Sequence, residues 1–368
     1  MSGHTPSKDA GAISELLRAG AILGAKANMH ELAFGITSNN AVTGPVHNPA
    51  DLDKIAGGSS GGTAAAVAAG IFPFGLGTDT GGSCRIPAAL CGVVGFRPST
   101  GRYSGDGIVP ISHTRDTVGP IARSVADVAL IDEVLSRDAQ ETTVRAISEI
   151  TLGVPRDFFF DNLDSEVEQA VNAQLRALEM AGAKLVEVSM PDIWGHNEAF
   201  GFPVVLYEVM RELPEYLAIH APDISFDDLI AGIGSPDVAG IIASQMGDEA
   251  MPEAAYRAAL DIHRPAMLQI YQSIFDSHNI DAIVFPTTPL PARDIGQDET
   301  VDLNGSQVPT FPTYIRNTDL GSNLGAPGIS LPCPGVNGLP VGIEFDGLPG
   351  HDAALLGLAK AVEEALAP

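Results

Sequence analysis

Residues 57–85 read GGSSGGTAAAVAAGIFPFGLGTDTGGSCR and are the most informative stretch of the chain. Glycines flank two serine sites, Ser59-Ser60 and Ser83, and the small residues between them predict a helix over 63–69. Glycines beside a serine allow the backbone to approach a ligand closely. Consecutive N–H groups in such a turn can converge on an oxygen that gains negative charge in acyl transfer. The pair of sites therefore favours serine-based acyl transfer, although one such turn alone is more often a serine-capped tight turn.

Four other interpretations of the motifs depend on the sequence around them. Residues 57–61 match the GxSxG nucleophile elbow, but the preceding residues are loop-like where the elbow needs an apolar strand. Neither GK[ST] nor GxGxxG after a strand occurs, so no nucleotide-binding fingerprint applies. HExxH and CxxC are also missing, so we expect no metal site. His113 would be the base of a Ser–His–Asp enzyme, an option that only geometry can decide.

The composition describes an acidic globular protein. Of 368 residues, 45% are hydrophobic and 18% charged, and the formal net charge is −26. A nucleic-acid binder needs a basic surface to displace counterions, so we expect no nucleic-acid partner, and anionic membranes are disfavoured for the same reason. The N-terminus lacks a signal-peptide pattern, and the uncharged residues 57–78 hold too many glycines for a membrane helix. We therefore expect a cytoplasmic protein without membrane association.

The order of predicted elements favours one α/β domain over residues 1–368. A strand at 152–155, a long helix at 164–181 and a strand at 184–188 together predict a parallel crossover unit. Residues 198–280 predict mostly helices, inserted in the middle of this domain. Further expected elements are strands at 21–23, 282–285, 329–331 and 341–345, and a polar loop at 293–310.

Motifs along most of the chain resemble the amidase signature family. The central match is GGSSGGTAAAVAAG followed by GLGTDTGGSCRIPAALCGVVGFRPSTG. The match continues with KANMHE at 26–31, TRDT at 114–117, FPTTP at 285–289 and GLPVG at 338–342. Only the stretch from about residue 150 to residue 280 lacks motifs that match the family. Within the family, MHELAFGITSNN and GFRPSTGRYS are most similar to the indoleacetamide and mandelamide hydrolases.

The resemblance implies both a fold and a reaction. The fold is α/β, a central mixed sheet covered by helices on both faces in a three-layer α/β/α arrangement. The reaction is hydrolysis of a small amide to a carboxylate and ammonia through an acyl-serine, without a metal or an organic cofactor. The variable helices at 198–280 are expected to form a wall of the substrate pocket. Candidates to face an aryl group are Trp194, Phe200, Phe202 and Tyr207, although each of them taken singly is more often a core residue.

The resemblance also implies roles for single residues. Ser83 matches the nucleophile that forms the acyl-enzyme, and Ser59 matches the bridging serine, which in the family follows a cis peptide bond. The backbone groups of Thr80, Gly81 and Gly82, with that of Ser83 itself, match the oxyanion hole.

Three neighbouring residues are expected to support the serine loop. Asp79 and Arg85 flank the nucleophile, and they either hold the loop in place or form a plain ion pair. Ser60 is expected to act as a hydrogen-bonding support and not as a carrier of the proton.

The family uses a buried, neutral lysine to take the nucleophile's proton through the bridging serine. Three lysines precede the serine stretch, Lys8, Lys26 and Lys54, and none matches the family's Val-Lys-Asp-like segment. We therefore expect an N-terminally truncated family member in which none of these three amines reaches the Ser59 hydroxyl. Loss of a general base lowers hydrolysis by roughly 10²–10⁴-fold.

Two other functions stay open for such a chain. One is a non-catalytic protein of the amidase fold that binds small amides or a protein partner. The other is an esterase that uses the same serine, because ester alkoxides leave more easily than amines. Loss of N-terminal helices could also expose an apolar patch that a second copy covers, which would give a homodimer.

Overall fold

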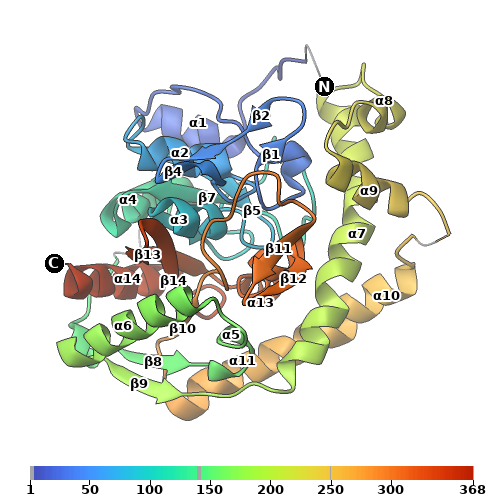
Figure 1. Cartoon of the computed structure of the whole chain (residues 1–368). Coiled ribbons are helices and arrows are strands. Elements are labelled where there is room, and N and C mark those ends of the chain that lie inside the picture. Colours follow the sequence, from blue (N-terminus) through green and yellow to red (C-terminus); the bar gives the residue numbers. More distant parts are fainter. Residues whose placement is uncertain (1–3, 139–141, 249, 368) are drawn as a thin grey trace.

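An eight-stranded mixed sheet is the central layer of the computed structural model, which describes residues 4–138, 142–248 and 250–367 (Figure 1). The strands, in their order across the sheet, are β5 (Phe74–Asp79), β7 (Thr117–Ala122), β6 (Val94–Arg97), β13 (Gly328–Val336), β14 (Leu339–Asp346), β10 (Ala282–Pro286), β8 (Thr151–Val154) and β9 (Lys184–Glu187). The pairs β10–β8 and β8–β9 are parallel, and the other pairs of this sheet are antiparallel. The predicted mixed sheet is confirmed.

The crossover unit lies at one edge of this sheet. Strands β8 and β9 pair in parallel with Thr151 opposite Lys184, and α6 (Ser165–Ala181) connects them. Asp164 caps α6 by accepting a hydrogen bond from the Glu166 N–H at 2.9 Å. Gly182 ends the helix at a φ of 112°, a conformation that suits glycine. The predicted strand–helix–strand unit is therefore present.

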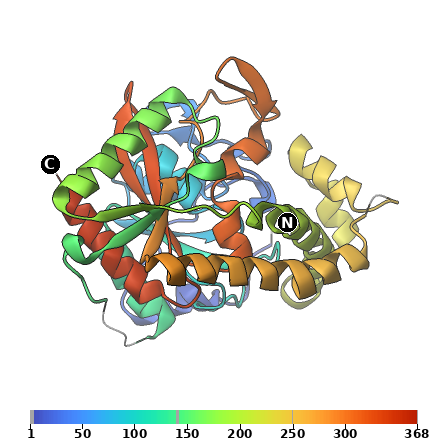
Figure 2. The ribbon, with the colours of Figure 1, turned by 90° about the horizontal axis from the view of Figure 1, so that it is seen from below.

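Helices cover both faces of the sheet (Figures 1 and 2). One face carries α4 (Val125–Ser136), α6 and α14 (Asp352–Leu366), with α6 and α14 in contact with each other. The opposite face carries α2 (Gly61–Ala68) and α3 (Arg85–Cys91), and α11 (Arg264–His278) shares an apolar cluster with Ile283 and Phe285 of β10. This is the three-layer arrangement that the sequence predicted.

Side chains alternate along β13 and β14, so one face of these strands is apolar and the other carries charged residues. Ile329, Leu331, Val341, Ile343 and Phe345 pack into the core beneath α4, α6 and α14. The intervening residues face α3, and two of them are the acidic side chains of Glu344 and Asp346. The sheet thus presents buried carboxylates to the segment that carries Arg85.

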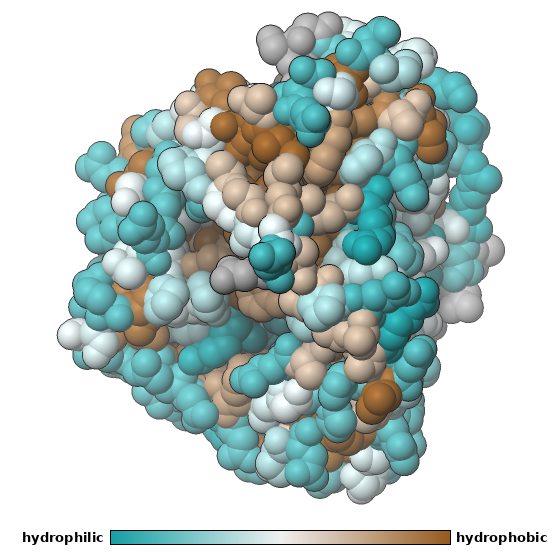
Figure 3. Space-filling model, turned by 90° about the vertical axis from the view of Figure 1, so that its right-hand side faces the viewer, coloured by the Kyte–Doolittle hydropathy of each residue, from teal (hydrophilic) through white to brown (hydrophobic). Residues whose placement is uncertain are grey.

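A separate group of helices lies on the side of the molecule away from α14 (Figure 1). It comprises α7 (Ile193–His220), α8 (Phe226–Ala231), α9 (Pro236–Ser244), α10 (Glu253–Ala258) and the π-helical turn η3 (Ala259–His263), which leads into α11. Helices α7, α8 and α9 share an apolar cluster that also includes Phe34 and Ile111. Figure 3 faces this side and shows apolar side chains gathered on its surface near a hollow.

Two local predictions are wrong. Residues 21–23 form no strand, since Ile22 is 91% exposed and Leu23 53% exposed, and neither has a strand partner in the described residues. The loop at 293–310 contains a hairpin of β11 (Thr300–Leu303) and β12 (Ser306–Pro309). Asn304 and Gly305 turn it with φ angles of 55° and 82°. An Asn-Gly pair between alternating residues is a strong hairpin signal, so the sequence carried this information.

Short elements complete the described chain: α1 (Gly11–Arg18), η1 (Glu31–Ala33), β1 (Asn39–Asn40), β2 (Gly44–Pro45), β3 (His47–Asn48), β4 (Asp51–Ile55), η2 (Ile147–Glu149), α5 (Arg156–Phe159), α12 (Thr310–Ile315) and α13 (Asp319–Leu324). Helices α12 and α13 follow the hairpin and lie close to the serine loop. Within the part of the chain that the structure describes, no helix has the length and apolar character of a membrane span.

Candidate active site

The two serine sites of the sequence are neighbours in the fold. Ser60 immediately precedes α2, and Ser83 lies in the turn between β5 and α3. The Ser60 N–H donates to the Ser83 carbonyl at 3.2 Å. The Ser60 hydroxyl donates to the Thr78 carbonyl at 3.3 Å and accepts from the Thr78 N–H at 3.2 Å. Ser60 therefore ties the start of α2 to the end of β5.

Ser59 follows the cis peptide bond that the resemblance implied, between Gly58 and Ser59. Its carbonyl accepts hydrogen bonds from the His30 N–H at 3.0 Å and from the Ser38 hydroxyl at 3.1 Å. The side chain of Ser59 is fully buried, and its hydroxyl has no hydrogen-bond partner among the described residues. A buried hydroxyl in this state has its full donor and acceptor capacity available.

None of the three upstream lysines reaches Ser59, as the sequence predicted. Lys54 Nζ pairs with Asp294 Oδ1 at 2.6 Å, on the surface. Lys8 and Lys26 are exposed. The Ser59 hydroxyl has no hydrogen-bond partner among the described residues, so no lysine amine of these residues is bonded to it.

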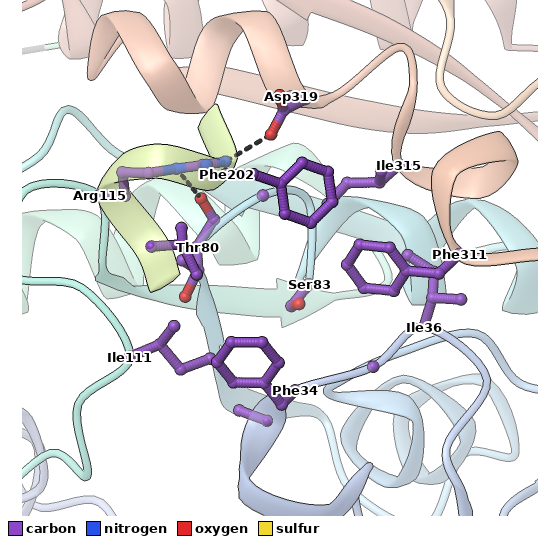
Figure 4. Close-up of a pocket in the computed structure, with 14 residues that line it drawn as sticks. Phe34, Ile36, Thr80, Ser83, Ile111, Arg115, Phe202, Phe311, Ile315 and Asp319 are labelled. Atoms are coloured by element: carbon purple, nitrogen blue, oxygen red, sulfur yellow. Dashed lines mark hydrogen bonds and ion pairs between the residues drawn. The ribbon is translucent and has the colours of Figure 1, made fainter. Parts of the chain in front are cut away.

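Ser83 lies in a pocket whose walls are mostly apolar (Figure 4). The pocket spans about 600 Å³, open solvent included. Phe202 and Phe311 approach each other with ring centroids 6.3 Å apart. The complete lining is Ala33, Phe34, Gly35, Ile36, Thr80, Gly81, Ser83, Ile111, Arg115, Phe202, Val205, Phe311, Ile315 and Asp319.

Of the four aromatic candidates on α7, Phe202 lines this pocket. Phe200 is fully buried in the core, because two positions along a helix turn the side chain to nearly the opposite side. Trp194 stacks on Phe158 with ring centroids 3.6 Å apart, and Tyr207 stacks on another buried tyrosine. These three side chains therefore belong to the apolar core or pack against it, the alternative that the sequence favoured for each residue taken singly, and only Phe202 of the four lines the pocket.

The remaining apolar wall comes from residues that sequence analysis did not single out. Phe34 and Ile36 belong to the segment after η1, Ile111 precedes β7, and Phe311 and Ile315 belong to α12. The segment 29–40 was recognised as a family motif, but nothing in it assigned these side chains to a pocket. Their convergence depends on contacts between distant parts of the chain.

A buried carboxylate shapes the serine loop. Asp79 accepts hydrogen bonds from the N–H groups of Gly82 at 2.9 Å and Cys84 at 3.1 Å. It also pairs with Arg85 at 3.1 Å and with Arg97 at 3.0 Å. Burial would raise the pKa of Asp79, but the two guanidiniums outweigh burial and hold it well below its usual range. The pair predicted between Asp79 and Arg85 is thus part of a larger clamp.

The clamp also bears on the predicted oxyanion loop. The Gly82 N–H already donates to Asp79 in this structure. Gly82 adopts a φ of 136°, and a Cβ there would lie 2.2 Å from the Thr318 hydroxyl, so the position requires glycine. The Thr318 hydroxyl in turn donates to the Gly81 carbonyl. These contacts fix the direction of the peptide groups beside Ser83.

Arg115 connects the serine loop to the walls of the pocket (Figure 4). Its Nε donates to the Thr80 carbonyl at 3.1 Å, and its Nη1 donates to the Gly201 carbonyl of α7 at 3.2 Å. Its Nη2 pairs with Asp319 Oδ1 of α13 at 2.5 Å. The Thr80 hydroxyl donates to Asp116 at 2.5 Å. One guanidinium therefore joins three elements, and the Arg115–Asp319 pair forms the charged part of an otherwise apolar lining.

His113 does not take the place of a base. Its side chain is 68% exposed and bonds to Glu212, with Glu208 3.4 Å away. It is not part of the Ser83 pocket, so the Ser–His–Asp option is wrong. These three residues could geometrically hold a metal ion. However, Glu208 already accepts a hydrogen bond from the Tyr256 hydroxyl at 2.9 Å, so the group is explained as a tie between α7 and the loop before β7.

Comparison with known proteins identifies the class of this fold and site. The family model for amidases matches residues 1–356, and the chain belongs to the amidase family. It is therefore an amide-hydrolysing enzyme of the three-layer α/β/α fold.

The similar proteins include hydrolases of aryl-bearing amides. An indoleacetamide hydrolase from Rhizobium radiobacter is 46% identical over 367 residues, covering 100% of this chain and 79% of the relative. A mandelamide hydrolase from Pseudomonas putida is 44% identical over 386 residues, covering 100% of this chain and 74% of the relative.

Solved structures agree with this assignment. A crystal structure of an amidase superposes with a TM-score of 0.87 at 37% identity, covering 99% of this chain and 79% of the other. The peptide amidase from Stenotrophomonas maltophilia gives a TM-score of 0.79 at 27% identity, covering 99% of this chain and 77% of the other.

The charges around Arg85 predict a pH-dependent stability. Arg85 and Arg97 face the carboxyl groups of Asp79, Glu344 and Asp346, so one carboxyl has no guanidinium to balance it. Burial raises the pKa of Asp346 from 3.8 to about 6, although Arg85 opposes this shift, and burial likewise raises the pKa of Glu344. A carboxyl whose pKa is raised on folding stabilises the fold below its unfolded pKa, and that contribution is lost as the pH rises through the folded pKa.

We expect Asp346→Asn, which cannot ionise, to gain stability relative to the wild type as the pH rises from 4 to 7. The gain should be on the order of 2 kcal/mol. Urea unfolding at several pH values measures it, with the exposed Asp223→Asn as the matched control. If the free energy of unfolding depends on pH in the same way for the wild type and Asp346→Asn, the raised pKa of Asp346 is contradicted.

Proposed function

We propose that this enzyme hydrolyses small amides with an aryl-bearing acyl group, using Ser83 as the nucleophile. The observation that carries the proposal is the position of Ser83 among Phe34, Phe202 and Phe311 in one pocket (Figure 4). Aromatic walls suit a flat apolar group, because burial of such surface contributes roughly 25 cal/mol per Å². The names of the indoleacetamide and mandelamide hydrolases, similar over the whole chain, support the same substrate class.

The proposed reaction proceeds in two steps. The Ser83 hydroxyl attacks the amide carbon and passes its proton to the Ser59 hydroxyl, which releases its own proton toward the amide nitrogen, and the carbonyl oxygen becomes an oxyanion. Backbone N–H groups of Thr80, Gly81 and Gly82, with that of Ser83, would stabilise this charge, with Gly82 sharing its N–H with Asp79. The C–N bond breaks, and the nitrogen, which has received the proton released by Ser59, leaves as ammonia. Water then cleaves the acyl-Ser83 ester to release the carboxylate.

Three further residues act by support in this proposal. Asp79 and Arg85 hold the loop in place, because Asp79 accepts from the N–H groups of Gly82 and Cys84 and from Arg85 Nε. Ser60 holds the start of α2 against β5 and thereby sets the position of Ser59. None of the three needs to touch the substrate, so each is a positioning residue.

Ser83→Ala should abolish both covalent labelling and amide turnover. A fluorophosphonate probe reports the nucleophile, and release of ammonia from an arylacetamide reports hydrolysis. The matched control is Ser273→Ala, which removes an exposed serine of α11. Equal labelling of wild type and Ser83→Ala would refute the nucleophile assignment.

The same experiment separates the alternatives when a nitrophenyl ester is assayed beside the amide. Ester turnover that depends on Ser83, without amide turnover, identifies an esterase. Amide binding without turnover of either substrate identifies a non-catalytic protein of this fold.

We also propose that the helical region at 198–280 supplies a wall of the substrate pocket. Phe202 and Val205 of α7 lie in the lining and support this role. Phe202→Ala should lower kcat/KM for an arylacetamide by roughly tenfold or more, since an apolar contact of this size is worth about 1–3 kcal/mol. Acetamide turnover should change little, and the exposed Ile219→Ala on the same helix serves as the control. Equal losses for both amides would contradict a role in recognising the aryl group.

A homodimer is a further proposal. Ile22, Leu23 and Ile71 are exposed, and a Cβ on Gly24 would lie 2.6 Å from the Phe72 ring, so the two exposed segments lie side by side. Apolar patches of this kind favour association. Sedimentation should give a dimer for the wild type and a monomer for Ile22→Glu. A monomeric wild type at all concentrations would refute the proposal.

A cytoplasmic location completes the proposal. Cys84, Cys91 and Cys333 are free and buried, which suits a reducing compartment. Burial raises the pKa of the Cys91 and Cys333 thiols to about 12, so both stay in the unreactive thiol form at neutral pH.

A further inference from the structure

A second cavity lies apart from the Ser83 pocket and shares none of its lining residues. It opens between the loop after β6, the end of α13 and the start of α11. Gly101 and Gly350 at its border are exposed, so the cavity is accessible from solvent. Its lining is Ser99, Thr100, Gly101, Arg102, Ser136, Arg137, Asp138, Arg264, Leu268, Leu324, Gly325, Pro349, Gly350 and Asp352.

Two of the three arginines in this lining are neutralised by acidic partners. Arg102 Nη2 pairs with Asp132 Oδ2 at 2.8 Å, and Arg137 pairs with Glu15. The Asp352 carboxylate is likewise occupied, since it accepts from the N–H and the hydroxyl of Ser99 at 2.7 and 2.6 Å. The third arginine, Arg264, differs from both.

Arg264 forms neither a hydrogen bond nor an ion pair with any residue that the structure describes, and its Nε is buried. The guanidinium carbon of Arg264 lies 5.8 Å from the centroid of the Phe200 ring, which is a weak cation–π contact. Burial lowers the pKa of Arg264, which expresses the cost of holding this charge away from water. A buried donor without a partner is costly, so the guanidinium favours an acceptor from outside the chain.

A bare glycine leaves room for such an acceptor. A Cβ on Gly325 would lie 2.8 Å from Arg264 Nη2 and 3.3 Å from Thr100 Oγ1, so both polar atoms converge over this glycine. The Thr100 hydroxyl accepts a hydrogen bond from Arg97 Nη2 at 2.9 Å, which leaves its own proton to donate. Gly325 has a φ of 71° at the end of α13, so both its backbone and its surroundings select glycine.

We propose that this cavity binds a small oxyanion, a carboxylate or inorganic phosphate, between Arg264 and Thr100. A guanidinium presents paired N–H donors that match two oxygens of either group, and the threonine hydroxyl adds a third donor. Because Asp132 and Glu15 neutralise Arg102 and Arg137, the guanidinium of Arg264 supplies the positive charge of the site. The attraction for an oxyanion comes from this one guanidinium, in a chain whose formal net charge is −26.

Titration calorimetry tests the site on the whole chain. Phosphate and acetate are titrated separately at constant ionic strength, with sodium chloride as the blank. The wild type should bind one equivalent of at least one oxyanion, and Arg264→Gln should bind it at least tenfold more weakly. Arg257→Gln, which removes an exposed arginine of α10, should match the wild type. Binding of phosphate identifies the natural ligand as a phosphate, and binding of acetate identifies it as a carboxylate.

Two outcomes would overturn the proposal. One is no binding of either oxyanion by the wild type beyond the chloride blank, and the other is equal affinity of the wild type and Arg264→Gln.

If Arg264→Gln does not fold, chemical modification of the wild type tests the anion site without a variant. Phenylglyoxal modifies accessible arginines, and mass spectrometry reports each site. Phosphate or acetate should slow modification of Arg264 severalfold and leave Arg257 unchanged. Equal rates at Arg264 with and without the anion would refute the site. Because both readouts measure binding and not amide hydrolysis, failure here is independent of the proposed reaction.

Discussion

The loop between β5 and α3 depends on one buried carboxylate, Asp79. Two backbone N–H groups of the loop and the guanidiniums of Arg85 and Arg97 converge on it. Removing one partner of a buried ion pair typically costs about 3–5 kcal/mol, because the other charge is left uncompensated. The position of Ser83 is therefore set by electrostatics in the interior and not by the flexibility of a glycine-rich turn.

The sheet supplies the other half of this arrangement. Strand alternation sends the apolar side chains of β14 into the core beneath α6 and α14, and it sends Glu344 and Asp346 toward Arg85. The same strand thus stabilises the fold and balances the charge beneath the site. Arg115 extends the network outward, because it holds the Thr80 carbonyl and also contacts α7 and α13. Pocket walls and serine loop are consequently joined by direct polar contacts.

Sequence patterns predicted those features that depend on neighbouring residues or on an ordered set of motifs. They include the crossover through β8, α6 and β9, and, as implied by the resemblance to the amidase family, the mixed α/β sheet and the cis peptide bond before Ser59. The strand predicted at 21–23 was wrong because a strand needs a partner for its backbone groups, and periodicity cannot supply one. The hairpin at β11 and β12 was missed although its Asn-Gly turn was visible in the sequence.

The sequence by itself determined the family and the glycine-flanked serine turns, because glycine and serine act there through local backbone geometry. Only the tertiary structure decided that Phe202 faces Ser83 while Phe200 does not, and that Phe34 and Phe311 complete the wall. It also decided that Arg264 is left without a partner among the described residues. Each of these outcomes depends on which side chains from distant segments meet, and that follows from packing of the whole chain and not from any local pattern.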